Sequence, residues 1–144
     1  MTATLEPDVL IVGAGPVGMT LALCLAQRRV RCTVVEMKAA HAATEVKCNH
    51  ISARSMEIYR RLGVAVDLRA SGLPDDYPHD VSYRTSTVGQ EITRIHIPGR
   101  LTRLTDHSGP DGWWPTPEPP HRLNQRFIEP ILARHVQQQP LIQC

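Results

Sequence analysis

A chain of 144 residues, with 42% hydrophobic and 21% charged residues, is long enough for one globular domain with its own core. The formal net charge of +2 gives no electrostatic reason to expect a nucleic-acid partner. No apolar run approaches the ~20 residues of a membrane-spanning helix, and no signal-peptide pattern opens the chain, so we expect a cytoplasmic protein without a membrane partner.

The first predicted elements are a strand, a glycine-rich turn, a helix and a second strand within residues 8–36. Residues 9–12 are a short apolar run, typical of a strand buried on both faces of a parallel sheet. Pro16 suits the first turn of a helix. The apolar face of that helix is expected to include Val17, Leu21 and Leu25. Residues 32–36 form a second apolar run, so the default geometry is a right-handed βαβ unit.

The next stretch predicts a loop followed by a helix. Residues 37–51 have no hydrophobic period and are expected to form the loop. Residues 52–62 predict a helix, and Gly63 stands where a C-terminal cap belongs. Within this helix Arg54 is expected to pair with Glu57 at i,i+3 rather than contact a cofactor.

A hairpin outside the main sheet is predicted in the middle of the chain. Val81 and Tyr83, and later Ile95 and Ile97, alternate with polar residues, and Gly89 lies between the two runs. Alternation of this kind is typical of two short strands joined by a turn.

The last third of the chain predicts an irregular connection, a helix and the beginning of a strand. Residues 98–120 contain six prolines and are expected to form a long irregular connection. Residues 122–138 predict a helix, in which Pro130 requires either a kink or a later start. Residues 141–142 resemble the beginning of a strand that is incomplete at the C-terminus.

The cysteines and histidines show no spacing typical of a metal site. None of the four cysteines belongs to a C-x-x-C pair, and the seven histidines lack H-E-x-x-H or similar spacing. We therefore expect reduced thiols and no bound metal.

The motif that indicates chemistry is G-x-G-x-x-G at Gly13, Gly15 and Gly18, between the predicted strand and the predicted helix. Gly13 permits the tight turn, Gly15 allows the backbone to approach a pyrophosphate, and Gly18 allows close packing of helix on strand. Glu36 ends the next strand, 18 residues after Gly18, where a carboxylate accepts hydrogen bonds from ribose hydroxyls. The alternative is a tight βα turn without a ligand.

The same motif restricts the nucleotide. The negative charge of Glu36 disfavours the 2′-phosphate of NADP, so FAD and NAD both remain open on these residues. The chain lacks G-x-x-x-x-G-K-[ST], so a P-loop is not supported.

Three segments together resemble the single-component FAD-dependent aromatic hydroxylases. They are "DVLIVGAGPVGMTLAL", "NHISARSMEIYRRLGV" and "HRLNQRFIEPILARH", and the resemblance extends over nearly the whole chain. It implies a Rossmann-like α/β FAD-binding domain of residues 1–144 with FAD as cofactor. It also implies a monooxygenase that uses NAD(P)H and O2 to hydroxylate a phenolic or other aromatic substrate.

The resemblance also implies which residues bind FAD. Lys47 falls where many family members carry an arginine near the FAD phosphate or adenosine, and Gln125 falls near the flavin side of the pyrophosphate, with Arg122 close by. The complete set of implied cofactor residues is Gly13, Gly15, Pro16, Gly18, Glu36, Lys47, Arg122 and Gln125. No catalytic residue is assigned.

The family pattern is incomplete in these residues. Family members carry a later DG motif, a later GD motif and a substrate domain, whereas Asp111-Gly112 lies too early to fill the first role. We therefore expect a truncated hydroxylase that is inactive alone, completed by a missing C-terminal half or present as a homo-oligomer. Two other readings are a small NAD-dependent dehydrogenase domain and a non-catalytic nucleotide-binding remnant or half of a split protein.

Overall fold

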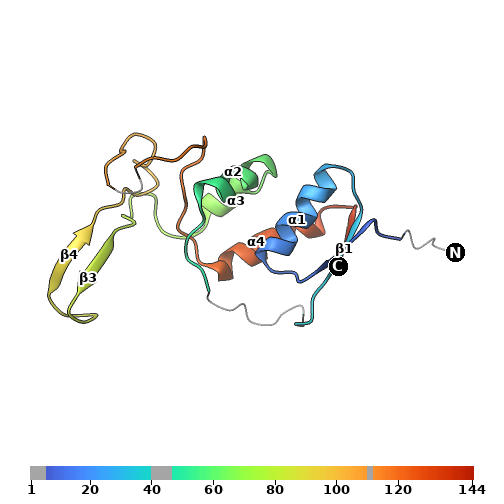
Figure 1. Cartoon of the computed structure of the whole chain (residues 1–144), viewed down its shortest axis with the longest axis horizontal. Helices are drawn as coiled ribbons and strands as arrows, with labels where there is room; N and C mark the ends of the chain where they lie inside the picture. The colour runs from blue at the N-terminus through green and yellow to red at the C-terminus, as the bar shows by residue number, and fades with distance from the viewer. Residues whose placement is uncertain (1–5, 40–46, 110–111) are drawn as a thin grey trace.

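The computed structural model describes residues 6–39, 47–109 and 112–144. Its elements in chain order are β1 (Val9–Val12), α1 (Pro16–Gln27), β2 (Cys32–Val35), α2 (Ala53–Arg61), α3 (Ala65–Ala70), β3 (Val81–Arg84), β4 (Glu91–Ile95), α4 (Gln125–Gln137) and β5 (Ile142–Gln143). The strands form a parallel sheet in the order β1-β2-β5 and a separate antiparallel hairpin of β3 and β4 (Figure 1). The predicted α/β class is confirmed. No helix in the described part of the chain is long and apolar enough to cross a membrane.

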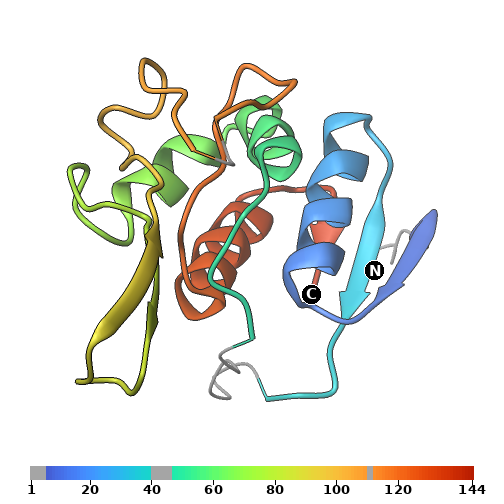
Figure 2. The same ribbon diagram turned by 60° about the vertical axis from the view of Figure 1, so that its left-hand side comes forward.

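The βαβ unit forms as predicted. β1 and β2 pair in parallel from Val9 with Cys32 to Val12 with Val35. Helix α1 packs along one face of this sheet, and α4 lies beside α1 (Figure 2). The predicted apolar face of α1 is wrong at Val17, which is 83% exposed, and at Leu21, which is 46% exposed, whereas Leu25 packs partly buried against the core. The residues of α1 that are buried instead are Met19, Ala22, Leu23 and Ala26.

Strand β1 is not buried on both faces, contrary to the prediction from its continuous apolar run. Ile11 is buried, but Leu10 is 61% exposed and Val12 is 83% exposed. The reason is that α1 covers only one face of the sheet, so alternate residues of β1 face outward. The outward face of β1 and the exposed side of α1 together form an open apolar surface, made up of Leu10, Val12, Val17 and Leu21.

Most of the core lies between the helices. One small cluster, which includes Ile11, Ala22 and Val34, packs α1 on the sheet. A larger cluster joins α1, α2, α3 and α4 through Met19, Leu23, Ile51, Met56, Tyr59, Val64, Ala65, Leu68, Leu123, Ile128, Ile131, Leu132 and Val136. Neither cluster contains a residue of segment 72–120.

Helix α2 begins and ends at residues with the expected chemistry. The Ser52 hydroxyl caps the helix by accepting a hydrogen bond from the Ser55 N–H at 3.2 Å. Gly63 follows with a φ of +77°, a left-handed conformation that favours glycine at a C-terminal cap. The short helix α3 comes directly afterwards and was not predicted, because six residues are too few to show a helical period.

Helix α4 begins at Gln125, three residues later than the predicted range of 122–138. The Asn124 side chain causes this start, because its Oδ1 accepts a hydrogen bond from the Arg126 N–H at 3.1 Å. The helix continues through Pro130 to Gln137, so a start after this proline is excluded. Strand β5 follows and pairs in parallel with Cys32 and Thr33 of β2.

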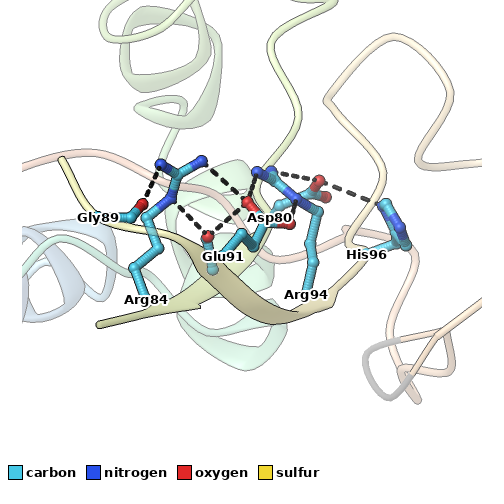
Figure 3. Close-up of polar contacts among 7 residues, drawn as sticks. Asp80, Arg84, Gly89, Glu91, Arg94 and His96 are labelled. Atoms are coloured by element: carbon cyan, nitrogen blue, oxygen red, sulfur yellow. Dashed lines mark hydrogen bonds and ion pairs between the residues drawn. The ribbon is translucent and has the colours of Figure 1, made fainter. Parts of the chain in front are cut away.

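The β3–β4 hairpin lies away from the sheet (Figure 1) and is held by charged side chains. The Arg94 guanidinium pairs with Glu91 at 2.6 Å and with Asp80 at 3.1 Å (Figure 3). Arg84 pairs with the same Glu91 at 3.0 Å. These contacts lower the pKa of Glu91 to about 2, chiefly through the hydrogen bond from Arg94. Strand β4 ends at Ile95, so Ile97 of the predicted second strand lies beyond the hairpin.

The proline-rich connection contains no helix or strand in its described parts, 98–109 and 112–120. Side-chain pairs hold it, one to the rest of the chain and one within the connection itself. Arg69 forms an ion pair with Glu118 at 2.7 Å. The buried Arg103 guanidinium lies over the Trp114 ring, 5.0 Å from its centroid. Asp111 of the early Asp-Gly pair lies outside the described residues.

Candidate nucleotide-binding site

The three glycines of the motif have different surroundings. Gly13 has a φ of +107°, which only glycine adopts readily. A Cβ on Gly18 would stand 1.9 Å from the Gly13 carbonyl oxygen, so close packing of helix on turn requires glycine here. A Cβ on Gly15 would meet no protein atom within 4 Å, and its φ of −74° is open to any residue. The protein's own packing therefore does not explain Gly15, whereas a ligand close to the backbone does.

The N-terminus of α1 has no neutralising group from its own residues. The N-cap residue, Gly15, has no side chain with which to cap the helix, and the first turn carries no acidic residue. By contrast, Ser52 caps α2 and Asn124 caps α4. The first turn of a helix presents N–H groups without intrahelical acceptors and the positive end of the dipole. This helix end thus has the properties of an anion-binding site.

Glu36 lies at the carboxyl end of β2 and reaches back to the glycine turn. Its Oε2 accepts a hydrogen bond from the Ala14 N–H at 2.8 Å, and its Oε1 accepts one from the Lys38 N–H at 3.0 Å. These bonds, the one from Lys38 first, lower the pKa of Glu36 below its ordinary value. The side chain is therefore an anion at neutral pH, with lone pairs left for further donors.

A cavity of about 800 Å³ joins the glycine turn to α4. It brings together four residues predicted to bind the cofactor, and these are Gly15, Glu36, Lys47 and Gln125. Gly13, Pro16 and Gly18 line a different hollow, of about 490 Å³, against the open apolar surface, and Gly15 borders both. The larger volume lies in the range of small-molecule sites, and the cavity opens at the carboxyl end of the parallel strands.

Gln125, the first residue of α4, is bound to the segment that follows Lys47. Its backbone N–H donates to the Cys48 carbonyl at 2.8 Å. Its side-chain Nε2 donates to Glu129 Oε1 at 2.7 Å, which directs the amide along the cavity side of the helix.

Arg122 does not join this group. It lines a neighbouring cavity of about 530 Å³ together with Asn49, His79 and Asp80. The separation arises because α4 begins only at Gln125. Arg122 therefore lies on extended chain, and its side chain does not follow the helical face of Gln125.

The cavity also contains residues that sequence reasoning missed. Ala14, Lys38, Glu129, Ala133, Arg134 and Gln137 all line it. The sequence could have indicated three of them, because positions 129, 133 and 137 follow Gln125 at intervals of four and so lie on the same helical face. Lys38 had no such signal, since its place depends on how the chain leaves β2.

Comparisons with known proteins agree with this geometry. A family model described as an FAD binding domain matches residues 6–144. The chain is 34% identical to the FAD-dependent monooxygenase apdD of Emericella nidulans over 98% of its own length and 23% of the relative's. It is 31% identical to 2,4-dichlorophenol 6-monooxygenase of Cupriavidus pinatubonensis over 93% of its own length and 22% of the relative's.

Two solved structures share the fold. The rebeccamycin biosynthetic enzyme RebC with reduced flavin has a TM-score of 0.82 and 39% identity, covering 98% of this chain and 25% of that one. The flavin-dependent monooxygenase PieE in complex with FAD and substrate has a TM-score of 0.74 and 29% identity, covering 96% of this chain and 24% of that one. The chain thus spans about a quarter of the length of these proteins.

Proposed function

The chain belongs to the FAD binding domain family, which its match over residues 6–144 establishes, and on that premise we propose that the cavity of about 800 Å³ holds the adenosine diphosphate half of FAD. The observation that carries this proposal is the meeting of Gly15, Glu36, Lys47 and Gln125 in one cavity beside an uncapped helix N-terminus. FAD is the cofactor of the family, and when bound it supplies the redox chemistry.

Each residue then has a role that follows from its position. Gly15 lets the pyrophosphate approach the backbone, and the first turn of α1 offers it N–H groups. Gly13 and Gly18 shape the turn, and Pro16 preorganises the first helical residue. Glu36 accepts hydrogen bonds from the ribose hydroxyls. Lys47 provides a positive charge near the phosphates, and Gln125 offers a side-chain amide on the far side of the cavity.

A binding experiment tests the FAD site. Titration of the chain with FAD, ADP, FMN and adenosine 2′,5′-bisphosphate is followed by fluorescence and calorimetry. We expect FAD and ADP to compete for one site, FMN to bind at least about tenfold more weakly, and the 2′-phosphate to weaken binding. Glu36→Gln is expected to reduce the discrimination against the 2′-phosphate.

Glu6→Gln is the matched control, because it removes the same charge from an exposed residue outside the cavity. It is expected to leave all four affinities unchanged. Equal binding of FMN and FAD, or equal effects of the two substitutions, would contradict the proposed site.

The whole protein's activity is a further part of the proposal. Relatives named as monooxygenases, two of them acting on 2,4-dichlorophenol and phenol, support a flavin-dependent monooxygenase that uses NAD(P)H and O2 on an aromatic substrate. No catalytic residue is assigned among the described residues that line the cavities. We therefore expect these 144 residues alone not to hydroxylate an aromatic substrate. Oxidation of NAD(P)H coupled to hydroxylation of phenol by the isolated chain would refute this expectation.

The open apolar surface supports one more proposal about the whole protein. Val12 of β1 and Val17 of α1 are each 83% exposed, and a parallel sheet such as the one that contains β1 is normally covered on both faces. We propose that polypeptide outside these residues covers this surface in the complete enzyme. Co-expression with the downstream part of a relative tests this, and a concentration-dependent homodimer in sedimentation experiments would favour a second copy instead.

A further inference from the structure

A second cavity lies next to the proposed FAD cavity and has a different character. Its volume is about 530 Å³. Its apolar wall consists of Leu73, Tyr77, Pro78, Leu123 and Phe127. An apolar cavity of about 150 Å³ is enough for one benzene ring. The second cavity therefore has room for an aromatic system of more than one ring.

The polar side of this cavity carries one arginine, Arg122, and one carboxylate, Asp80. Arg122 lines it half-buried, and no carboxylate of residues 6–39, 47–109 or 112–144 pairs with its guanidinium. His79 lies on the same wall, and its pKa is lowered by burial first and then by the charges of Arg122, Arg103 and His50. Among the charges that act on His79, the arginine cations come first and the Asp80 carboxylate opposes them.

The one acidic residue named on the cavity wall is already neutralised by its neighbours. Asp80 Oδ2 pairs with Arg94 at 3.1 Å and with His96 Nδ1 at 3.2 Å (Figure 3). Its Oδ1 accepts a hydrogen bond from the Ile97 N–H at 2.8 Å. Among the residues that the structure describes, Arg122 is therefore the charged group of this cavity wall that is open to a ligand.

The two cavities are lined by neighbouring residues of the same two segments. Lys47 lines the FAD cavity and Asn49 lines the second cavity, two residues further along the same segment. Gln125 lines the FAD cavity and Arg122 lines the second one, three residues earlier. The hydrogen bond from the Gln125 N–H to the Cys48 carbonyl, at 2.8 Å, ties these two segments together.

We propose that the second cavity binds an aromatic ring that carries a carboxylate or phenolate, and that Arg122 pairs with this anionic group. Arg122 is then a specificity-determining residue for the aromatic ligand. It is not the FAD ligand that the sequence resemblance implied. The identity of this ligand as the substrate of the flavin reaction rests on the proposed function, whereas its binding at Arg122 does not.

The test uses 2-naphthoate and its neutral isostere 2-naphthamide. Amide chemical shifts of the ¹⁵N-labelled chain are followed during titration with each compound. We expect 2-naphthoate to shift residues 72–80 and 122–127, and to bind at least about tenfold more tightly than 2-naphthamide, because a charge-assisted hydrogen bond to Arg122 is lost with the amide. This comparison needs no variant and so does not depend on the folding of one.

Three variants locate the anion contact. Arg122→Gln is expected to weaken 2-naphthoate about tenfold or more and to leave 2-naphthamide unchanged. Arg122→Lys should retain part of the preference for the anion, because lysine keeps the charge and loses the planar fork. Arg61→Gln removes an equal charge from an exposed residue of α2 outside both cavities and should change neither affinity.

Parallel FAD titrations separate this inference from the proposed function. Retention of FAD affinity in Arg122→Gln with loss of 2-naphthoate binding supports the inference. If FAD does not bind at all but 2-naphthoate binding depends on Arg122, the proposed function fails and the second site stands. Displacement of 2-naphthoate by saturating FAD, equal loss of both ligands in Arg122→Gln, or indifference of 2-naphthoate to Arg122 would overturn the second site.

Discussion

The βαβ unit with its covering helices and the segment 72–120 are stabilised by different forces. The first is packed from apolar side chains, and both core clusters consist of residues outside 72–120. The second is tied by arginine–carboxylate pairs, including Arg94 with Asp80, Arg84 with Glu91, and Arg100 with Asp75. Apolar burial depends on fit and changes little with acid or salt, whereas partly exposed ion pairs depend on both. The first region is therefore sensitive to shape and the second to charge.

The largest effect is expected from a methyl group added in the shape-sensitive region. Gly18→Ala would place a Cβ against the Gly13 carbonyl oxygen, 1.9 Å away in the unrelaxed structure. Since the obstacle is backbone, the turn or the helix must move. We expect the free energy of unfolding to fall by about 3 kcal/mol or more, measured by urea denaturation.

Gly15→Ala is the matched control for this substitution, because its Cβ would meet no atom within 4 Å. It should cost less than about 1 kcal/mol of stability. Its effect should appear instead in FAD affinity, with a loss of about tenfold or more, because the pyrophosphate approaches this backbone. Equal stability losses in the two variants would show that the turn is not packed as described.

The second effect concerns His121, which directly follows segment 72–120 and is bound to the shape-sensitive region. His121 is buried, pairs by its backbone with Ile51, and donates from Nε2 to the Leu68 carbonyl at 3.0 Å. Burial first, and then the charge of Arg69, lowers its pKa from 6.5 to about 4. Between these values the unfolded chain binds a proton that the folded chain does not, so stability falls as the pH falls from 6.5 towards 4.

His121→Gln tests this, because glutamine keeps a donor for Leu68 and does not titrate. The wild-type chain should lose about 2 kcal/mol more than the variant between pH 7 and pH 5, as measured by urea denaturation at each pH. Parallel pH dependences of the two proteins would show that His121 is protonated in both states alike.

The third effect is confined to the charge-sensitive region. Asp80→Asn removes the charge that pairs with Arg94 and weakens the acceptor for the Ile97 N–H. We expect hydrogen exchange in β3 and β4 to accelerate to an extent equivalent to about 1–2 kcal/mol. Exchange in α1 and β2 should not change. Acceleration in both regions would mean that the hairpin and the core unfold together.

Acid should have the same regional effect without a substitution. The pKa of Glu91 is lowered from 4.5 to about 2, so its pairing with Arg94 and Arg84 is complete above 4.5 and is lost as the pH falls towards 2. We expect the hairpin to open over this interval and earlier in 1 M salt. A hairpin that stays protected in both conditions would show that packing and not charge holds it.

The same contrast explains which features the sequence could predict. The turn at Gly13, Gly15 and Gly18 was predictable because its requirements are local, namely a positive φ, a close approach and a nearby carboxylate. The buried face of α1 was not, because it depends on the partner α4 far along the chain. Leu10 and Val12 read as core, yet nothing in the described residues covers them.

The candidate site was predictable in part for the same reason. Glu36 follows from its position in the glycine motif and Gln125 from the family resemblance, and the two line one cavity. The resemblance implied a cofactor role for Arg122 as well, because it lies close to Gln125 in the sequence. Asn124 separates the two by capping the helix between them, a boundary that sequence patterns locate only within a few residues.

The smallest effect is expected from an ion pair in the shape-sensitive region. Arg54 and Glu57 meet at 2.6 Å on α2, but the Arg54 side chain is 69% exposed. Solvent screens such a pair, and i,i+3 pairs on helices contribute little. Arg54→Gln should therefore lower the free energy of unfolding by less than about 0.5 kcal/mol and leave FAD affinity unchanged, as measured by urea denaturation and FAD titration. A loss as large as that of Asp80→Asn would show that charge matters equally in both regions, and a loss of FAD affinity would show that Arg54 contacts the cofactor instead of pairing with Glu57.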